Sequence, residues 1–450
     1  MANRVSKQQS LFLILLWFGL QFRFIPGDLQ AQQFQKLREI NPPADPPDES
    51  VFAIVGGLLI DGLGGKPVED SIVVVRGNKI EAAGNRATVA LPAGIEQIDA
   101  HGMSVMPGLV DSHFHTATGD SINSIPPLFL SHGVTTARDP GRPIEVYAPY
   151  LDPGRLAPRL FLTGPHYDQP PMAWPDNAVA IESIEHAKRA TRKYFEQGAS
   201  AIKVYFRLPL AEIRATCEQA HGLGIPVTAH LELVDADLAV AAGLDGIEHI
   251  TSFGTALAEP EIAERFRASV FAENAARSDG RYRLWATLDF ANSPRKARLL
   301  KLLRDERVVV SPTLATFERR AGGKDIELFH VEGFEHMMEF VGECYRAGVT
   351  VVTGSHTWSP QVPMGWAYQR EMELLLESGL SPMEVILAST SHNAKFLGCD
   401  DRLGTLAPGK LADIVVVNGN PLEDMKAMYQ IAHVVQNGNR LEPGPTWDAQ

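Results

Sequence analysis

Cysteine is scarce in this chain of 450 residues, which contains only three. They lie far apart in the sequence and form no closely spaced pair of the kind that zinc fingers and redox motifs use. A disulfide framework and a zinc finger are therefore disfavoured, and we expect Cys217, Cys344 and Cys399 to be small buried side chains.

Positive charge is also in short supply. The chain has 41 Lys and Arg residues against 54 Asp and Glu residues, which gives a formal net charge of −13. An acidic protein is a poor match for nucleic acid and for anionic membrane surfaces, so we expect neither as a partner. Phosphate loops, dinucleotide fingerprints and nucleophile elbows do not stand out either.

Long hydrophobic runs are missing except for one short run near the N-terminus. It extends from Leu11 to Leu20, after Arg4 and Lys7, and is shorter than the ~20 residues that span a membrane. A basic start, a short apolar run and a polar continuation are typical of a secretory signal. We therefore expect residues 1–31 to be a signal peptide of an exported, periplasmic or secreted protein, with an uncleaved N-terminal anchor as the alternative.

The remainder has the composition of a folded protein, and its length suits a TIM-type barrel with a smaller attached domain. The polar, Pro-rich residues 32–50 predict a linker. Short β-rich runs and glycine turns recur in residues 51–105 and 404–441, which predicts one small β-sandwich domain built from both chain ends. Residues 106–403 alternate strands and helices, which predicts an α/β fold with a (β/α)8 barrel. Residues 442–450 form a tail.

Within the barrel region, individual elements can be assigned from their patterns. Residues 199–205 and 225–230 predict strands, and residues 210–222 have helical spacing between them. Residues 256–300 are richer in charge and in helix formers, and predict helices inserted over the barrel mouth.

A His-x-His pair lies at the end of the first predicted strand of the barrel region. Residues 105–115 have strand character, so His113 and His115 are expected to point to the same face. Two imidazoles on one face form a natural chelating pair for zinc or a similar divalent ion. Alone, such a pair is weak support, because it often arises by chance.

Two further histidines stand at predicted strand ends. His230 ends the strand at 225–230, and His249 ends the run that starts at Gly246. Catalytic groups of a barrel come from the ends of several strands. Four histidines at such positions therefore indicate a metal site more strongly than one histidine does.

Lys203 lies inside the apolar run 201–205. A buried lysine is costly unless it is paired or neutralised, and an edge strand with an outward lysine is the alternative. Next to a metal, a deprotonated lysine can react with CO2 to give a carbamate, a carboxylate that can bridge two metal ions.

These residues resemble the metal-ligand series of the amidohydrolase superfamily, in its usual order and spacing. Residues 107–111, 133–139 and 404–417 resemble further motifs of that family, and the resemblance covers residues 51–441. Within the superfamily the chain is most similar to the imidazolonepropionase and prolidase-like branch, which hydrolyses dipeptides, N-acyl amino acids and cyclic amides.

The resemblance implies a metal-dependent hydrolase of small amide or peptide substrates. His113 and His115 would hold the more buried ion and His230 and His249 the more exposed one. A carboxylated Lys203 would bridge them. One or two zinc ions are expected, with other divalent metals as alternatives, and bound water would attack a polarised carbonyl. Tyr205 could form a hydrogen bond to the substrate or to the developing oxyanion. The alternative is that its ring packs in the barrel.

The pattern departs from the family at His356, which stands where an aspartate usually ligates the buried metal and accepts a proton. Histidine can do both, but it cannot supply negative charge. Three interpretations stay open: a working substitute, a site with one metal, or lost activity. The corresponding alternative functions are an impaired homologue that acts as a binding protein, and a different reaction such as lactone hydrolysis.

Weaker candidates complete the site. His166 could line the substrate pocket. Arg138 could anchor a substrate carboxylate, with an ion pair to Asp139 or another acid as the alternative. Asp111 is expected to support the metal ligands and Asp139 to hold a loop. Homo-oligomers are common in this family, but this sequence indicates no interface.

Overall fold

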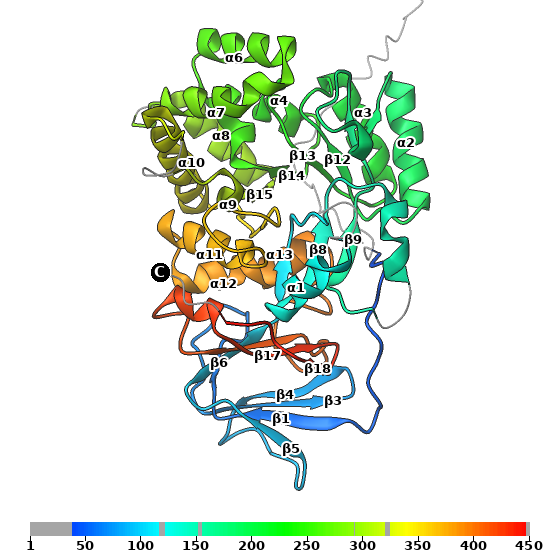
Figure 1. Ribbon diagram of the computed structural model, residues 1–450, viewed down its shortest axis with the longest axis vertical. Coiled ribbons are helices and arrows are strands. Elements are labelled where there is room, and N and C mark those ends of the chain that lie inside the picture. Colours follow the sequence, from blue (N-terminus) through cyan, green and yellow to red (C-terminus); the bar gives the residue numbers. More distant parts are fainter. Residues whose placement is uncertain (1–37, 117–121, 152–154, 292, 320–324, 447–450) are drawn as a thin grey trace, which may run out of the picture. The chain divides into compact units, whose positions relative to one another are not determined.

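The computed structural model describes residues 38–446 apart from residues 117–121, 152–154, 292 and 320–324 (Figure 1). The predicted signal segment lies outside the described residues. No described helix is long and apolar enough to span a membrane. The three cysteines are free and buried, as the sequence predicts.

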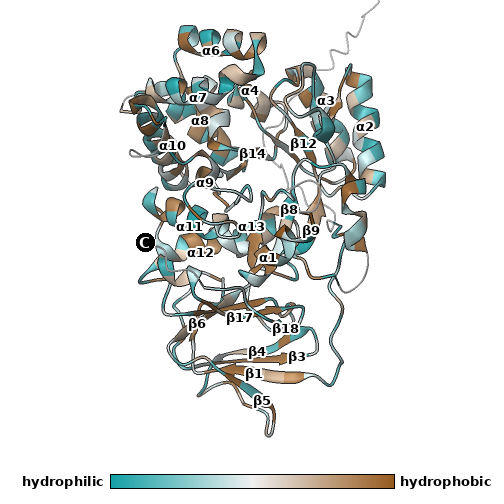
Figure 2. Ribbon diagram, viewed as in Figure 1, coloured by the Kyte–Doolittle hydropathy of each residue, from teal (hydrophilic) through white to brown (hydrophobic). Residues whose placement is uncertain are grey.

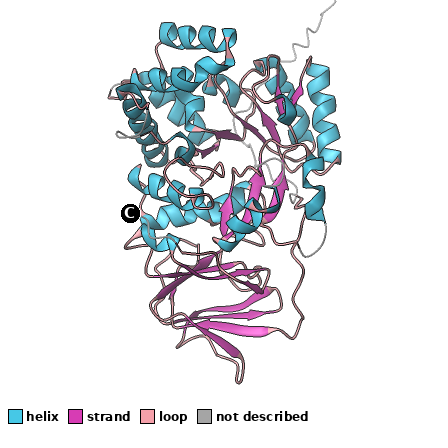
Figure 3. Cartoon of the chain, viewed as in Figure 1, coloured by secondary structure: helices cyan, strands magenta, loops and turns pink. Residues whose placement is uncertain are grey.

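Parallel strands that alternate with helices make up residues 109–403 (Figures 1 and 3). One parallel sheet contains β7 (Leu109–Asp111), β8 (Val134–Asp139) and β9 (Arg159–Leu162). A second, in the order β11-β10-β12-β13-β14-β15, contains β10 (His166–Asp168), β11 (Ala178–Ala180), β12 (Ile202–Val204), β13 (Val227–Ala229), β14 (Gly246–Glu248) and β15 (Val309–Ser311).

Backbone hydrogen bonds link the first sheet to segments next to the second. The Ser200 amide donates to the Leu162 carbonyl over 2.7 Å, and the Ser112 amide donates to the Thr353 carbonyl over 3.1 Å. A (β/α)8 barrel needs one more strand after β15, and the segment before His356 provides only one parallel bridge, Val310 to Val351. The assigned sheets therefore do not form one closed ring, and closure of the barrel stays a prediction.

Helices lie between and outside these strands. They are α1 (Ile125–Ser131), α2 (Ile184–Glu196), α3 (Leu210–Gly222), α4 (Ala236–Ala241), α5 (Gly254–Leu257), α6 (Pro260–Ala272), α7 (Arg277–Ala286), α8 (Pro294–Asp305), α9 (Leu314–Phe317), α10 (Leu328–Arg346), α11 (Ala367–Glu377), α12 (Pro382–Ser389) and α13 (Ser391–Phe396). Short 3-10 turns are η2 (Ile144–Leu151), η3 (Pro175–Asn177), η4 (Ile250–Phe253), η5 (Asn274–Ala276) and η6 (Met425–Tyr429). The prediction for 210–222 is confirmed by α3, and the charged segment 256–300 does form helices.

Capping explains where several helices begin. The Ser183 side chain accepts from the His186 amide before α2. Ser381 and Glu384 form a capping box at α12, with Pro382 at the first helical position. These side chains satisfy amide groups that a helix start leaves without partners.

A region with two sheets is built from both ends of the chain; we call it the two-sheet region. The first sheet, in the order β4-β3-β1-β5, contains β1 (Val51–Val55), β3 (Ser71–Arg76), β4 (Lys79–Asn85) and β5 (Glu96–Asp99). The second, in the order β18-β17-β16-β6-β2, contains β2 (Leu58–Leu59), β6 (Met103–Pro107), β16 (Ile414–Asn418), β17 (Ile431–Gln436) and β18 (Asn439–Leu441).

The two sheets share one apolar cluster. Ile54 and Val73 from the first sheet and Val105 and Val416 from the second are all fully buried members of it. The strands of this region are largely brown in Figure 2, the colour of hydrophobic residues. Burial of these side chains holds the N-terminal and C-terminal segments together.

The polar segment before β1 is attached to the rest of the chain. The Ile40 amide donates to the Leu160 carbonyl over 3.0 Å, and the Asn437 side chain donates to Asp45 over 2.9 Å. The described part of the predicted linker therefore lies along both other regions.

Candidate metal centre

The six side chains that the sequence predicts as metal ligands line one cavity of about 790 Å³. They are His113, His115, Lys203, His230, His249 and His356. Lys203 lies in β12, and His230 and His249 directly follow β13 and β14. The carboxyl ends of parallel strands meet at one edge, so residues far apart in the sequence converge there.

The imidazole rings are close enough to share an ion. The Nε2 atoms of His113 and His115 are 3.1 Å apart. Ring centroids are separated by 4.5 Å between His113 and His249 and by 4.4 Å between His230 and His249. One ligand atom each of His113, His249 and His356 lies within 4.8 Å of the others.

The His-x-His pair is placed by a loop and not by a strand. Strand character was predicted over 105–115, but β7 ends at Asp111, so this prediction is wrong for the pair itself. The loop is fixed by the segment after residue 355: the His356 amide donates to the His113 carbonyl over 2.7 Å. Thr357 Oγ1 accepts from the His115 amide and donates to its carbonyl, each over 2.7 Å.

Backbone strain is concentrated at this centre. His249, Thr313, His356 and Thr357 have φ angles of 65°, 50°, 51° and 71°. Residues with a Cβ rarely adopt such positive φ angles, because the Cβ then approaches the backbone too closely. Residues in this conformation are common at functional sites. The ring Nδ1 of His249 lies 2.7 Å from Thr313 Oγ1, so two of the strained residues support each other.

Asp139 orients His115, a role that the sequence did not suggest. Its Oδ1 lies 3.1 Å from Nδ1 of His115, and its Oδ2 accepts from the Tyr147 hydroxyl. Burial alone would raise the pKa of Asp139, but the contacts with His115 lower it. A carboxylate on Nδ1 fixes the tautomer, so that Nε2 is directed to the cavity.

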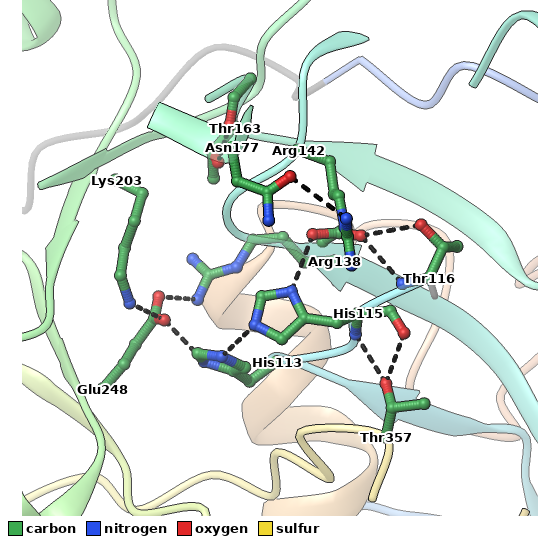
Figure 4. Close-up of polar contacts among 12 residues, drawn as sticks. His113, His115, Thr116, Arg138, Arg142, Thr163, Asn177, Lys203, Glu248 and Thr357 are labelled. Carbon is green, nitrogen blue, oxygen red and sulfur yellow. Dashed lines mark hydrogen bonds and ion pairs between the residues drawn. The ribbon is translucent and has the colours of Figure 1, made fainter. Parts of the chain in front are cut away.

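Lys203 is paired with Glu248, a residue that the sequence pattern did not single out. Its amine donates to the Glu248 carboxylate, and the other Glu248 oxygen accepts from Arg138 over 2.7 Å (Figure 4). Nδ1 of His113 lies 2.6 Å from the same carboxylate. Burial lowers the pKa of Lys203 to about 8, although Glu248 opposes the shift. The position of Glu248 inside the apolar run 246–250 is the sequence feature that indicates a buried ion pair.

Arg138 does not contact the cavity, so its prediction as a substrate anchor is wrong. It is 1% exposed and is absent from the described residues that line the cavity. Its guanidinium donates to Glu248 and to the Ser112 carbonyl. An ion pair of Arg138 with an acid was the alternative interpretation of the sequence, and the structure identifies that acid as Glu248.

Tyr205 and His166 both line the cavity, and their rings lie 4.4 Å apart. Tyr205 follows β12, and His166 begins β10 four residues after the end of β9. The Tyr205 hydroxyl accepts from Arg277 over 3.4 Å. Contact of either residue with a substrate stays a prediction.

The donor set fits a divalent metal ion. Burial lowers the pKa of His113 and of His230 to about 3 and holds the pKa of His249 and His356 well below the ordinary value. These imidazoles are therefore neutral, which is the form that ligates metals. In the described part of the chain, Nδ1 of His230 is buried without a hydrogen-bond partner. Neutral imidazoles that converge in one cavity suit a divalent transition-metal ion.

Comparison with known proteins gives consistent results. The sequence profile of the amidohydrolase family matches residues 104–441. The ochratoxinase of Aspergillus niger is 23% identical over 88% of each chain. The N-acyl-D-aspartate deacylase of Alcaligenes xylosoxydans xylosoxydans is 42% identical over a short stretch, 16% of this chain and 14% of that protein.

Solved structures are similar over nearly the whole chain. A provisionally assigned prolidase from Bifidobacterium longum gives a TM-score of 0.70 at 26% identity and covers 90% of this chain and 97% of that one. The crystal structure of the Aspergillus niger ochratoxinase gives a TM-score of 0.67 at 20% identity, with 90% and 99% covered. These likenesses confirm a TIM-barrel-type α/β fold.

Proposed function

Because the chain belongs to the amidohydrolase family, we propose that it is a metal-dependent hydrolase that cleaves amide or peptide bonds of small substrates such as dipeptides or N-acyl amino acids. Its membership and its similarity to proteins named ochratoxinase, prolidase and N-acyl-D-aspartate deacylase support an enzyme of the amidase or dipeptidase class. One observation carries the proposal: the imidazoles of His113, His115, His230, His249 and His356 and the Lys203 amine line the same cavity.

The proposed ligands are five of the cavity's histidines and a carboxylated Lys203, which together hold one or two divalent ions, with zinc preferred. The five are His113, His115, His230, His249 and His356. When bound, such an ion lowers the pKa of water and polarises a carbonyl. Carboxylation turns the cation that faces Glu248 into an anion. The modified lysine therefore needs the positive charge of the ions to stay beside that carboxylate.

The chain's own residues divide the remaining tasks. Asp139 and Thr313 hold the rings of His115 and His249 by their Nδ1 atoms. A neutral imidazole has one free nitrogen lone pair, so His356 can accept a proton from the attacking water only when that nitrogen is not bound to an ion. The Tyr205 hydroxyl can donate to the oxygen that develops negative charge.

The location of the enzyme is a separate part of the proposal. A basic start and a short apolar run within residues 1–31 favour export to the periplasm or to the medium. An N-terminal anchor is the alternative, and mass spectrometry of the mature N-terminus separates the two.

Elemental analysis combined with amide hydrolysis tests the proposal. We expect one or two equivalents of zinc, hydrolysis of dipeptides or N-acyl amino acids, and loss of both after chelation with recovery on zinc addition. A folded protein that binds no divalent metal and cleaves none of a panel of dipeptides, N-acyl amino acids and lactones would be a binding protein. Cleavage of lactones alone would indicate the alternative reaction.

His356→Asp decides whether the departure from the family is an adaptation. The ring of His356 lies 4.8 Å from that of His115 and 5.1 Å from that of His113, and Glu248 already provides a carboxylate. The shorter aspartate loses this reach, so we expect lower zinc content and a lower rate. His101→Asp, at an exposed turn, is the matched control. A higher zinc content and a higher rate for His356→Asp would show that the histidine at this position impairs the site.

A further inference from the structure

The cavity that holds the histidines has a wall rich in arginine. Arg142, Arg277, Arg281 and Arg319 line it, and no aspartate or glutamate is among the described lining residues. The chain as a whole carries a formal net charge of −13. A concentration of guanidinium groups against this background indicates that the cavity receives an anionic group.

Two of these arginines are held as a unit on α7. Arg277 and Arg281 are four residues apart, so they lie on one side of the helix. Arg277 Nε lies 2.8 Å from one oxygen of Glu232, and an Arg281 guanidinium nitrogen lies 2.9 Å from the other. Glu232 is buried, and the charges of both arginines hold its pKa well below the ordinary value against the effect of burial.

This arrangement leaves charge and hydrogen-bonding capacity for a ligand. One carboxylate opposite two guanidinium groups leaves a net positive charge inside the wall. Nε of Arg281 is buried and has no hydrogen-bond partner among the described residues. Arg277 also stacks over the Phe206 ring at 4.1 Å, which fixes the plane of its guanidinium group.

The pair lies directly beside the candidate metal ligands. An Arg277 guanidinium nitrogen is 3.3 Å from Nε2 of His230, and both terminal nitrogens are 3.4 Å from the Tyr205 hydroxyl. In an N-acyl amino acid the free carboxylate is attached to the carbon that follows the scissile nitrogen. A receptor for that carboxylate must therefore be adjacent to the groups that act on the scissile bond.

We propose that Arg277 and Arg281, aligned by Glu232, bind the free carboxylate of the amino-acid part of the substrate, and so select N-acyl amino acids and dipeptides over amides that lack this group. The proposal rests on the proposed function for the reaction, but carboxylate binding can be measured without it. Glu232 is a positioning residue, because it acts through the two arginines.

A pair of substrates that differ only in the carboxylate tests this selection. For wild-type zinc enzyme we expect kcat/KM for acetate release to be at least ~100-fold higher with N-acetyl-L-phenylalanine than with N-acetyl-L-phenylalaninamide. Arg277→Met is expected to lower the value for the acid by about 100-fold and that for the amide by less than threefold. Arg277→Lys should recover part of the loss, since it retains charge without the bidentate fork.

Arg283→Met is the matched control, because Arg283 lies on the same helix, is exposed and stacks on Phe329. We expect Arg283→Met to leave kcat/KM unchanged for both substrates. If Arg277→Met does not fold, as judged by thermal melting, Arg281→Met replaces it with the same expectation. Equal losses for acid and amide, or no preference in the wild type, would overturn the proposal.

Calorimetry separates this proposal from the reaction itself. We expect the wild type to bind N-acetyl-L-phenylalanine at least ~10-fold more tightly than the amide, and Arg277→Met to lose the difference. This result without any hydrolysis would refute the proposed reaction and support the carboxylate receptor. Hydrolysis without selective binding would support the proposed reaction and refute the carboxylate receptor. Absence of binding of either compound would also refute the receptor.

Discussion

Two interiors of this protein are buried to the same degree but differ in chemistry. In the two-sheet region, Ile54, Val73 and Val416 have no exposed surface and contact other aliphatic side chains. At the cavity, Lys203 and Glu248 are at most 2% exposed and need each other and Arg138 as partners. Apolar burial stabilises without specific partners, whereas a buried charge is tolerated only with them. The charged interior is therefore where function constrains the sequence.

The largest effect on stability is expected from the charged interior. Glu248→Gln leaves Lys203 and Arg138 buried opposite a neutral amide. Breaking a buried ion pair by removal of one partner costs about 3–5 kcal/mol. Denaturant unfolding of the metal-free protein measures this loss.

Glu264→Gln is the control for that experiment, since Glu264 is 73% exposed and pairs with Arg267 at the surface. We expect its effect to stay within about 0.5 kcal/mol. A loss below about 1 kcal/mol for Glu248→Gln would mean that the two interiors tolerate change equally well.

Histidine outside the cavity provides an intermediate case. His132 is buried, stacks on Trp366 at 3.9 Å and lies 3.2 Å from the Gly365 carbonyl. Burial lowers its pKa to about 4, against an ordinary value near 6.5. Between these values the unfolded chain binds the extra proton, so stability falls as the pH decreases through 6.5 and continues to fall to about pH 4.

His132→Asn removes this contribution. Between pH 7.5 and pH 5 we expect wild type to lose about 2 kcal/mol more than the variant does. Unfolding of both proteins at the two pH values gives the difference, from which the parallel contributions of the other histidines cancel. Identical pH dependence of the two proteins would show that His132 is protonated as readily in the folded state as in the unfolded chain.

The smallest effects are expected from the apolar interior. Ile54→Val in β1 should cost about 0.5–1.5 kcal/mol and leave kcat/KM for the best amide substrate unchanged. Ile202→Val in β12, next to Lys203 and equally buried, should cost a similar amount and also reduce the rate. Equal rates for the two variants would contradict the separation of the regions.

Local sequence patterns were sufficient to predict much of the fold and most of the metal centre. Repeated strands and helices between residues 106 and 403 predicted a TIM-barrel-type fold, because each element has its own periodicity. His113, His115, His230 and His249 could be selected because each stands near the end of an apolar run, where a barrel presents its reactive groups. Closure of the ring was not determined in this way, because the segment before His356 pairs with β15 through a single bridge at Val351.

The sequence by itself determined which side chains could meet a metal ion, because the ends of parallel strands come together in any fold of this type. Only the tertiary structure decided how the charges are paired: Lys203 with Glu248, Arg138 with Glu248, and Arg277 with Glu232. These partners are 45, 110 and 45 positions apart, and an ion pair depends on distance in space, which no local periodicity encodes. For the same reason Arg138 was mistaken for a substrate anchor, while the arginines of α7 that face the cavity were overlooked.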